Sequence, residues 1–374
     1  MTYKILFLNT VHKSFDDRVF YHQAKALSDH NHQIYIFSTQ EKINTNKDGI
    51  IIVSDKLHHL KLNEQSNRFY ASINQISPDI IICDSPIAVL LAFKYHFKKK
   101  SKIIYDITEW YPSRKNSYSN FFLFSAIKFT GLIFINLLAG CISDKLIFGE
   151  HYKSLPFSMF FWKKRIFIDY YPDLRYIRPL PPVDIKKSIR LYYSGWFNND
   201  KGIIQVLLLA RKVAETNKDM QIELNLTGEF NNENDRQQFE DYNQPQCSNL
   251  KINISGFKSF EEFCTEITNA DIFIDLRKND FENTHCLPIK LFYYLACGRP
   301  VIYSDLKSIH KVMDISNFGV SGNPNDTAYF TTKINEYIQN PDLYKLHCDN
   351  ATKIAVHEFN WNLIEDKFVH FVLN

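Results

Sequence analysis

Short apolar, β-branched runs alternate with longer amphipathic stretches along most of the chain. In the first half such runs predict strands at residues 4–8, 33–38, 50–54, 79–83, 102–107, 145–148 and 165–170. Amphipathic stretches predict helices between them, at residues 18–29, 67–75 and 87–97. Because the strands are almost continuously apolar and are separated by helices, the pattern is typical of a parallel sheet covered on both faces.

The pattern stops at a proline-rich stretch, residues 179–184, and then resumes. Three prolines in four residues cannot lie in a helix or a central strand, so this stretch predicts a stiff linker. Strands are then predicted at residues 190–194, 222–227, 250–255, 271–276 and 301–304, and helices at 201–216, 259–269, 287–297, 326–339 and 361–373. The sequence therefore predicts an α/β protein with two doubly wound, Rossmann-like domains, residues 1–178 and 185–356, whose ligands bind in a central cleft between them.

The small formal net charge of +3 hides an uneven distribution. Residues 94–165 hold 13 lysines and arginines against four acids, a charge of +9, which leaves −6 for the rest of the chain. The same span contains Phe121–Ile142, an apolar stretch with basic residues on its flanks. We expect this stretch to lie in the interface of an anionic membrane; a buried helix of the fold and a true membrane span are the alternatives. The overall charge is too small for a nucleic-acid-binding protein.

Several classes of site are excluded by what the sequence lacks. With only 11 glycines, none of them two positions apart, it contains neither the dinucleotide fingerprint nor a P-loop. No D-x-D pair or paired zinc spacing occurs, so no metal site is predicted. The seven scattered cysteines suit the reduced thiols of a cytoplasmic protein, and the start of the chain lacks the layout of a signal peptide.

The stretch Asn283–Asp305 carries the sharpest candidate site. Pro288 suits the first position of a helix, and Gly298 suits its C-terminal cap. Such a helix follows a strand and its loop, so its N-terminus would aim the N–H groups of residues 287–289 into the cleft, with Lys290 in the first turn. This arrangement predicts a diphosphate site, although an ordinary helix of the sheet explains the same residues.

The same stretch, with the pattern P-x-K-L-F-x-Y-x-A-x-G-x-P-V-I-x-S-D, resembles the donor-binding segment of family-4-type retaining glycosyltransferases of the GT-B fold. Further similarities follow in order along the chain, at residues 16–27, 105–112, 193–202 and 359–361. The resemblance implies transfer of a sugar, with retention, from a nucleotide sugar to a hydroxyl of a glycan or lipid-linked acceptor. It also implies no cofactor, no metal ion, and a closing segment, residues 357–374, that packs back on the first domain.

The resemblance also implies which residues form the donor site. These are Gly195, Trp196, Lys201, Gly202, His285, Leu287, Pro288, Ile289, Lys290 and Tyr293. His285 and Tyr293 stand where the family's E-x(7)-E motif has its two glutamates, and Trp196 stands where an arginine is usual. Lys201 and Lys290 would then stabilise the leaving diphosphate. Arg277, just past a predicted strand, either approaches the diphosphate or pairs with Asp280 or Glu282.

The candidate acceptor residues lie in the first half. Asp106 and Glu109 match the family's D-x-H-E stretch, with Thr108 at the usual histidine, and they either orient the acceptor or cap the following turn. His12, Lys13, Asp16, Asp17 and Arg18 follow the first strand, although Ser14 and Asp17 would also suit a capping box. We expect a peripheral glycosyltransferase on the inner face of the cytoplasmic membrane that extends surface glycans. A sugar-nucleotide 2-epimerase and a non-catalytic scaffold are the alternatives.

Overall fold

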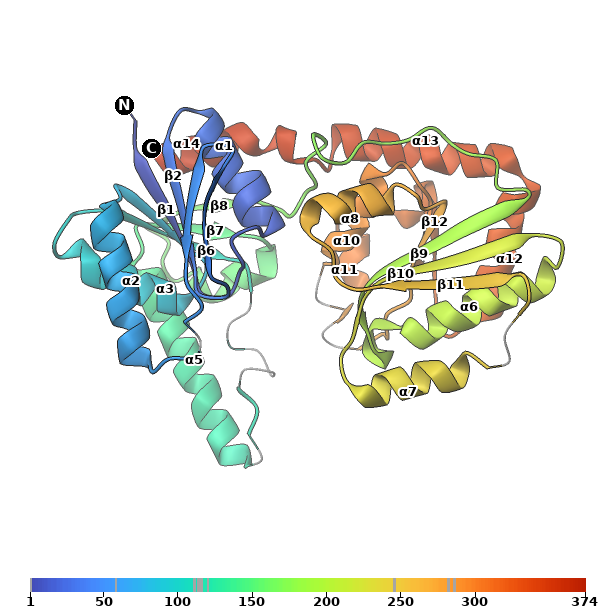
Figure 1. The fold of residues 1–374 in the computed structure, drawn as a ribbon, viewed down its shortest axis with the longest axis horizontal. Coiled ribbons are helices and arrows are strands. Elements are labelled where there is room, and N and C mark those ends of the chain that lie inside the picture. Colours follow the sequence, from blue (N-terminus) through green and yellow to red (C-terminus); the bar gives the residue numbers. More distant parts are fainter. Residues whose placement is uncertain are drawn as a thin grey trace. The chain divides into compact units, whose positions relative to one another are not determined.

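The computed structural model of the chain describes residues 1–374 apart from Met1, His58 and residues 110–111, 113–116, 120, 245–246, 281–282 and 285–286. It divides into two compact units, Met1–Tyr170 with Ile364–Asn374, and Tyr171–Leu363. The chain therefore passes between the units twice. Each unit holds a mainly parallel sheet with helices packed on it, and each is described by itself (Figure 1).

The first unit is built on an eight-stranded sheet. In spatial order its strands are β3 (Ile43–Lys47), β4 (Ile50–Ser54), β2 (Gln33–Ser38), β1 (Lys4–Asn9), β5 (Ile80–Cys83), β6 (Lys102–Ile107), β7 (Lys145–Phe148) and β8 (Lys164–Phe167). All pairs are parallel except β3 with β4, which form a hairpin at the edge that the sequence pattern did not predict. The helical segments are η1 (Asp17–Ala24), α1 (Lys25–Asp29), α2 (Leu62–Ile76), α3 (Pro86–His96), α5 (Phe122–Ile142), η2 (His151–Phe157) and α14 (Glu365–Leu373).

The second unit is built on a six-stranded parallel sheet. Its strands, in spatial order, are β11 (Leu250–Ser255), β10 (Gln221–Phe230), β9 (Ser188–Phe197), β12 (Ile272–Asp275), β13 (Val301–Ser304) and β14 (Gly319–Gly322), the doubly wound order. The helical segments are η3 (Asn199–Lys201), α6 (Ile203–Thr216), α7 (Glu233–Tyr242), α8 (Phe260–Ile267), α10 (Ile289–Ala296), α11 (Lys307–His310), η4 (Ile315–Asn317), α12 (Thr327–Gln339), α13 (Pro341–His357) and η5 (Trp361–Leu363).

The boundary between the units differs from the predicted one at residue 178. Tyr171 already belongs to the second unit, because its ring packs against Phe292 and Phe359 at centroid distances of 5.1 and 5.4 Å. The predicted linker also belongs to that unit, since Leu180 bonds Cys297 through its N–H and accepts from Arg299. The prolines therefore form an extended segment held against the second unit.

The predicted closing helix is divided in two by the structure. Its first turn, η5, stays with the second unit, where the N–H of Trp361 donates to the carbonyl of Pro172 at 2.9 Å. The remainder, α14, lies in the first unit and packs beside α1 and η1. Lys102 and Lys145, the first residues of β6 and β7, donate to carbonyl oxygens in the last turn of α14. Positive side chains suit the negative end of a helix dipole, so these lysines stabilise the docked helix.

The apolar stretch at residues 121–142 forms α5, a single helix of 21 residues. Figure 1 shows α5 running along the first unit and continuing well past its sheet. It is long and apolar enough to cross a membrane by length and composition, and 11% of its most apolar window is buried. The buried-helix alternative is therefore wrong for most of its length. The basic residues at 98–102 and 163–165 lie just before β6 and β8 or in their first residues, so they are at the amino edge of the sheet, where α5 ends.

Candidate active site

The predicted donor residues gather at the carboxyl edge of β9, in the second unit. Lys290, in the first turn of α10, donates from its Nζ to the carbonyl oxygen of Ser194. This contact requires glycine at 195, whose φ is +137°, because a Cβ there would lie 2.0 Å from the Lys290 Nζ. Burial lowers the pKa of Lys290 to about 7, with Arg277 and Lys201 adding to the effect against the opposing charge of Asp275. The amine is therefore poised to become charged when an anion arrives.

Lys201 approaches the same edge from η3. Its Nζ donates to the side-chain oxygen of Asn283 at 2.9 Å. The turn is closed by Gly202, with φ +77°, where a Cβ would lie 1.7 Å from the carbonyl oxygen of Leu276. Asn283 itself is buried and holds the loop through bonds to the carbonyls of Asp200 and Lys278. Sequence reasoning missed Asn283, because an asparagine in a loop carries no pattern.

Arg277 pairs with an acid of its own strand end. Its guanidinium makes a bidentate ion pair with Asp275, with bonds of 2.9 and 2.8 Å, and is buried. The hydroxyl of Tyr303 donates to the same carboxylate at 2.9 Å. The expected partners, Asp280 and Glu282, are therefore replaced by Asp275, two residues before Arg277 on β12; Glu282 lies outside the described residues. The pair fixes the end of β12 and uses the Nε and Nη2 groups of the arginine.

Helix α10 begins at Ile289, later than predicted. Pro288 is the N-cap residue rather than the first helical residue, because its ψ of 107° is extended. The unpaired N–H groups of the first turn then belong to Ile289 and Lys290, since proline has none and Leu287 precedes the cap. The start of α10 still brings the positive end of the helix dipole and a lysine side chain together at one site.

His285 and Tyr293 stand where the family's E-x(7)-E motif has its two glutamates, and the structure describes only the second of them. His285 lies outside the described residues. Tyr293 is 4% exposed, and its ring packs edge-on against Phe260 and Phe263 in the core of the second unit. By contrast, Trp196 is 46% exposed, and its ring lies edge-on to that of Phe257 at a centroid distance of 5.0 Å. The carboxyl edge therefore has an aromatic surface at the position where the family usually has an arginine.

A separate cavity lies elsewhere on this sheet. It has a volume of about 410 Å³ and is lined by polar residues of β9, β10, β11 and α8, among them Arg190, Asn225, Asn253 and Glu266. None of the predicted donor residues lines it. We therefore place the candidate donor site on the geometry around Lys290, and not on this cavity.

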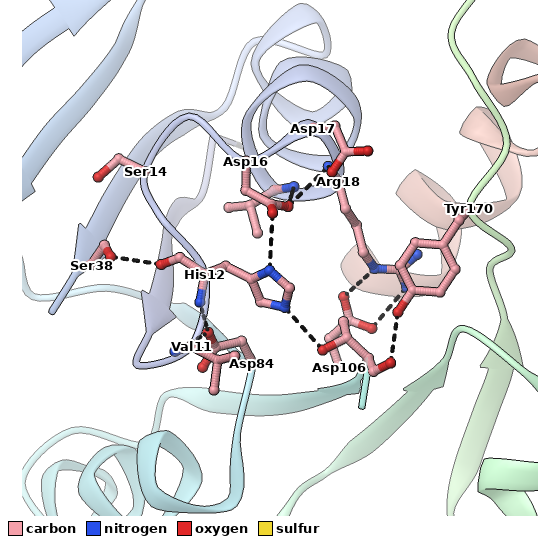
Figure 2. Close-up of polar contacts among 12 residues, drawn as sticks. Val11, His12, Ser14, Asp16, Asp17, Arg18, Ser38, Asp84, Asp106 and Tyr170 are labelled. Carbon is pink, nitrogen blue, oxygen red and sulfur yellow. Dashed lines mark hydrogen bonds and ion pairs between the residues drawn. The ribbon is translucent and has the colours of Figure 1, made fainter. Parts of the chain in front are cut away.

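In the first unit several predicted acceptor residues come together at the carboxyl edge of β1, namely His12, Asp16, Asp17, Arg18 and Asp106 (Figure 2). His12 bonds the Asp16 carboxylate through Nδ1 at 3.0 Å and the Thr108 hydroxyl through Nε2 at 3.1 Å. Asp84 holds the loop, since it accepts the backbone N–H groups of Thr10, Val11 and His12 at 2.9–3.0 Å. Asp84 is a further site residue that sequence reasoning missed.

The charge of His12 follows from these carboxylates. Burial by itself lowers its pKa, but the hydrogen bond and charge of Asp16, together with the charges of Asp84 and Asp106, outweigh this and raise the pKa to about 9. The ring is therefore an imidazolium at neutral pH. His12 thus presents a fixed cation beside Thr108, which occupies the position of the family's histidine.

Asp106 and Arg18 form an ion pair with each other, which the sequence did not suggest. The Arg18 guanidinium binds both Asp106 carboxylate oxygens, at 2.9 and 2.8 Å, and also the carbonyl of Ile168. Gln23 donates to Asp106 as well, at 2.7 Å, and the ion pair is buried. With these bonds made, the Asp106 carboxylate is engaged by Arg18 and Gln23 rather than by the turn that follows it.

The remaining acceptor-side residues are placed as follows. Lys13 and Glu109 are exposed at the same edge. Asp16 caps η1 through the N–H groups of Arg18 and Val19, so the predicted capping box is wrong: Ser14 bonds Ser54 instead. Asp17 accepts from the adjacent N–H of Arg18 at 2.9 Å. In the described part of the chain, no three His, Cys, Asp or Glu side chains gather to hold a metal ion.

Comparison with solved structures identifies the fold. Sucrose-phosphate synthase from Thermosynechococcus elongatus is 14% identical with a TM-score of 0.70, and HepE from Anabaena, solved with UDP-glucose, is 12% identical with a TM-score of 0.69; each comparison covers 98% of both chains. The lipopolysaccharide outer core galactosyltransferase WaaB is 16% identical with a TM-score of 0.56, over 99% of both chains. The protein has the GT-B fold, as predicted.

The comparison with family models is more specific for the second unit. Residues 182–354 match the family described as glycosyl transferases group 1, and this range contains every predicted donor residue. The chain matches none of the curated proteins compared with it. The family match and the fold together support a glycosyltransferase of GT-B architecture.

Proposed function

We propose that the protein transfers a sugar, with retention and without a metal ion, from a nucleotide-sugar donor to a hydroxyl of a lipid-linked glycan. The product would be a surface polysaccharide or glycoconjugate, made at the inner face of the cytoplasmic membrane. The observation that carries the donor half of this proposal is the half-buried Lys290, whose amine is directed across Gly195 at the carboxyl edge of β9. HepE, a neighbour in fold, is solved with UDP-glucose.

The donor site supplies positive charge without a metal ion. When a diphosphate binds, its charge raises the pKa of Lys290, so that the amine takes up a proton and neutralises the leaving group. The first N–H groups of α10 donate to the same oxygens, and Lys201 adds a second cation. The leaving phosphate accepts the proton of the acceptor hydroxyl, so this mechanism assigns no protein base.

The acceptor half rests on the first unit. The imidazolium of His12 donates to the Thr108 hydroxyl, so that this hydroxyl keeps its own proton to donate at the carboxyl edge, and Glu109 offers an exposed acceptor. The exposed apolar length of α5 and the basic excess of residues 94–165 support a peripheral location on an anionic membrane, where a lipid carrier would present the glycan.

A donor panel tests the proposal. Purified protein is titrated calorimetrically with UDP-, GDP- and dTDP-sugars, and then incubated with the donor that binds and a lipid-linked acceptor, with and without EDTA. We expect nucleotide release only with acceptor, no effect of EDTA, and retention in the product's NMR spectrum. Lys290→Met should abolish donor binding, whereas Lys345→Met, at an exposed lysine of α13, should not.

The other outcomes separate the alternatives. Conversion of the donor sugar without acceptor would contradict transfer and favour a 2-epimerase. Absence of binding by every nucleotide sugar would contradict the donor site and favour a scaffold. Inversion in the product would leave a glycosyltransferase but overturn retention.

A further inference from the structure

Thr108 is the first residue after β6, outside the ladder of backbone bonds in the sheet. The ladder reaches Ile107, whose carbonyl accepts from the N–H of Gly149. Thr108 is nevertheless buried, and its hydroxyl accepts from the His12 ring at the carboxyl edge. Because the sheet no longer fixes the backbone there, the partners of Thr108 determine how its hydroxyl and the next residue, Glu109, are presented.

The Thr108 carbonyl oxygen accepts from two side chains. One donor is the Nζ of Lys153, which also bonds the Glu150 carboxylate at 3.0 Å; both of these residues follow β7 and are buried. The other donor is the hydroxyl of Tyr170, at 2.9 Å. A carbonyl oxygen has two lone pairs, so both can be used here. The two bonds fix the direction of the carbonyl, and with it the planar peptide group that joins Thr108 to Glu109.

The Tyr170 side chain is itself anchored within the first unit. Its ring lies over the Arg18 guanidinium, 4.6 Å from the ring centroid, beside the buried pair of Arg18 with Asp106 (Figure 2). Glycine at position 149 makes room for the ring, because a Cβ there would lie 2.3 Å from it. Burial raises the pKa of the Tyr170 hydroxyl well above its usual range despite the charge of Arg18, so the hydroxyl keeps its proton and continues to donate.

We propose that Tyr170 is a positioning residue for the acceptor. By holding the Thr108 carbonyl, it sets the orientation of the peptide that follows and thereby the places of the Thr108 hydroxyl and the Glu109 carboxylate. The inference rests on the proposed function, in which those two groups bond the acceptor. Because Tyr170 acts through Thr108 and belongs to the first unit, its loss should impair use of the acceptor and leave donor binding, in the second unit, unchanged.

Tyr170 permits a cleaner test than Lys153 does. Replacing Lys153 would leave Glu150 buried without its cation, which destabilises the fold by itself. Tyr170→Phe removes a single hydroxyl and keeps the ring over Arg18. The matched control is Tyr344→Phe. Tyr344 is also buried, and its hydroxyl also donates to one backbone carbonyl, that of Asp271 at 3.1 Å, but this bond lies at the amino edge of the second sheet.

The native protein and the two variants are compared by three measurements. These are hydrogen exchange of residues 102–109, donor affinity by calorimetry, and sugar transfer to a farnesyl-diphosphate-linked N-acetylglucosamine, with hydrolysis of the donor by water followed in parallel without acceptor. In Tyr170→Phe we expect exchange at residues 108–109 to be about fivefold faster, the factor that one hydrogen bond typically contributes. The kcat/KM for the acceptor should fall at least tenfold, while donor affinity and donor hydrolysis stay native. Tyr344→Phe should match the native protein in all of these.

Two results would overturn the proposal. Native acceptor kinetics in Tyr170→Phe would mean that its hydroxyl does not set the position of the acceptor groups. A parallel loss of donor affinity, donor hydrolysis and transfer would mean that Tyr170 supports only the fold. Failure of the proposed function looks different, because the native protein itself would then bind no nucleotide sugar or transfer nothing to the acceptor, and the acceptor role of Tyr170 would fall with it.

Discussion

The buried Arg18–Asp106 pair permits a sharp test of whether Asp106 serves structure or chemistry. Both side chains are almost fully buried, 3% and 4% exposed, and the carboxylate accepts three hydrogen bonds, two from Arg18 and one from Gln23. Replacing Asp106 by leucine leaves the Arg18 cation without its partner. Removing one member of a buried ion pair typically costs about 3–5 kcal/mol, out of a total stability of about 5–15 kcal/mol for a domain.

The assay is hydrogen exchange of β6 combined with urea unfolding. We expect Asp106→Leu to unfold at markedly lower urea and to lose protection in residues 102–107. The double variant Arg18→Met with Asp106→Leu should recover most of the loss, since an apolar pair of similar volume often replaces a buried ion pair at little cost. If the double variant is stable and active, Asp106 has no chemical role. If it is stable and inactive, Asp106 acts in the reaction as well as in the fold. An Asp106→Leu protein as stable as the native one would refute the reasoning.

Three further predictions concern Gly195, Lys290 and His12. Gly195→Ala should weaken UDP binding at least tenfold by calorimetry, because the new Cβ displaces the Lys290 amine and strains a backbone with φ +137°, a cost of about 1–3 kcal/mol; unchanged affinity would contradict the site. UDP binding should take up a proton and weaken as the pH rises through 7, where free Lys290 titrates, whereas Lys290→Arg should flatten this dependence; equal pH profiles would contradict it. The raised pKa of His12 stabilises the fold fully below pH 6.5, and this contribution should fade as the pH rises through about 9. His12→Gln should lack that loss in urea titrations, and an identical loss in the variant would contradict the assignment.

The regular elements were largely predictable because their signals are local. The apolar strands and most helices follow from periodicity, which is a property of neighbouring residues. Helix α13 was missed although Asn340 caps it and Pro341 occupies its first turn. Its buried positions, such as Tyr344, Cys348 and Ala351, are spaced correctly but are weakly apolar, so the pattern was faint.

The site was predicted less well because its contacts are between distant residues. Arg18 and Asp106 are 88 positions apart, and both were read as free groups, since the sequence does not show which charges meet. Asp84 holds the loop before His12 across more than 70 positions and belongs to no motif. The exposure of α5 could not be predicted from composition either, because a core helix and a lipid-facing helix have the same apolar residues.

The double passage of the chain between the units has a consequence for how they can be separated. One connection follows Tyr170 and the other follows Leu363, and the Trp361–Pro172 hydrogen bond holds their second-unit ends together. A single protease cut at either connection would leave both units tethered through the other one. The nicked protein would run as two fragments on a denaturing gel and yet migrate as one particle in solution, and only a second cut would release the units. Twisting of one unit against the other is restrained in the same way, because two covalent tethers wind around each other where one would turn freely.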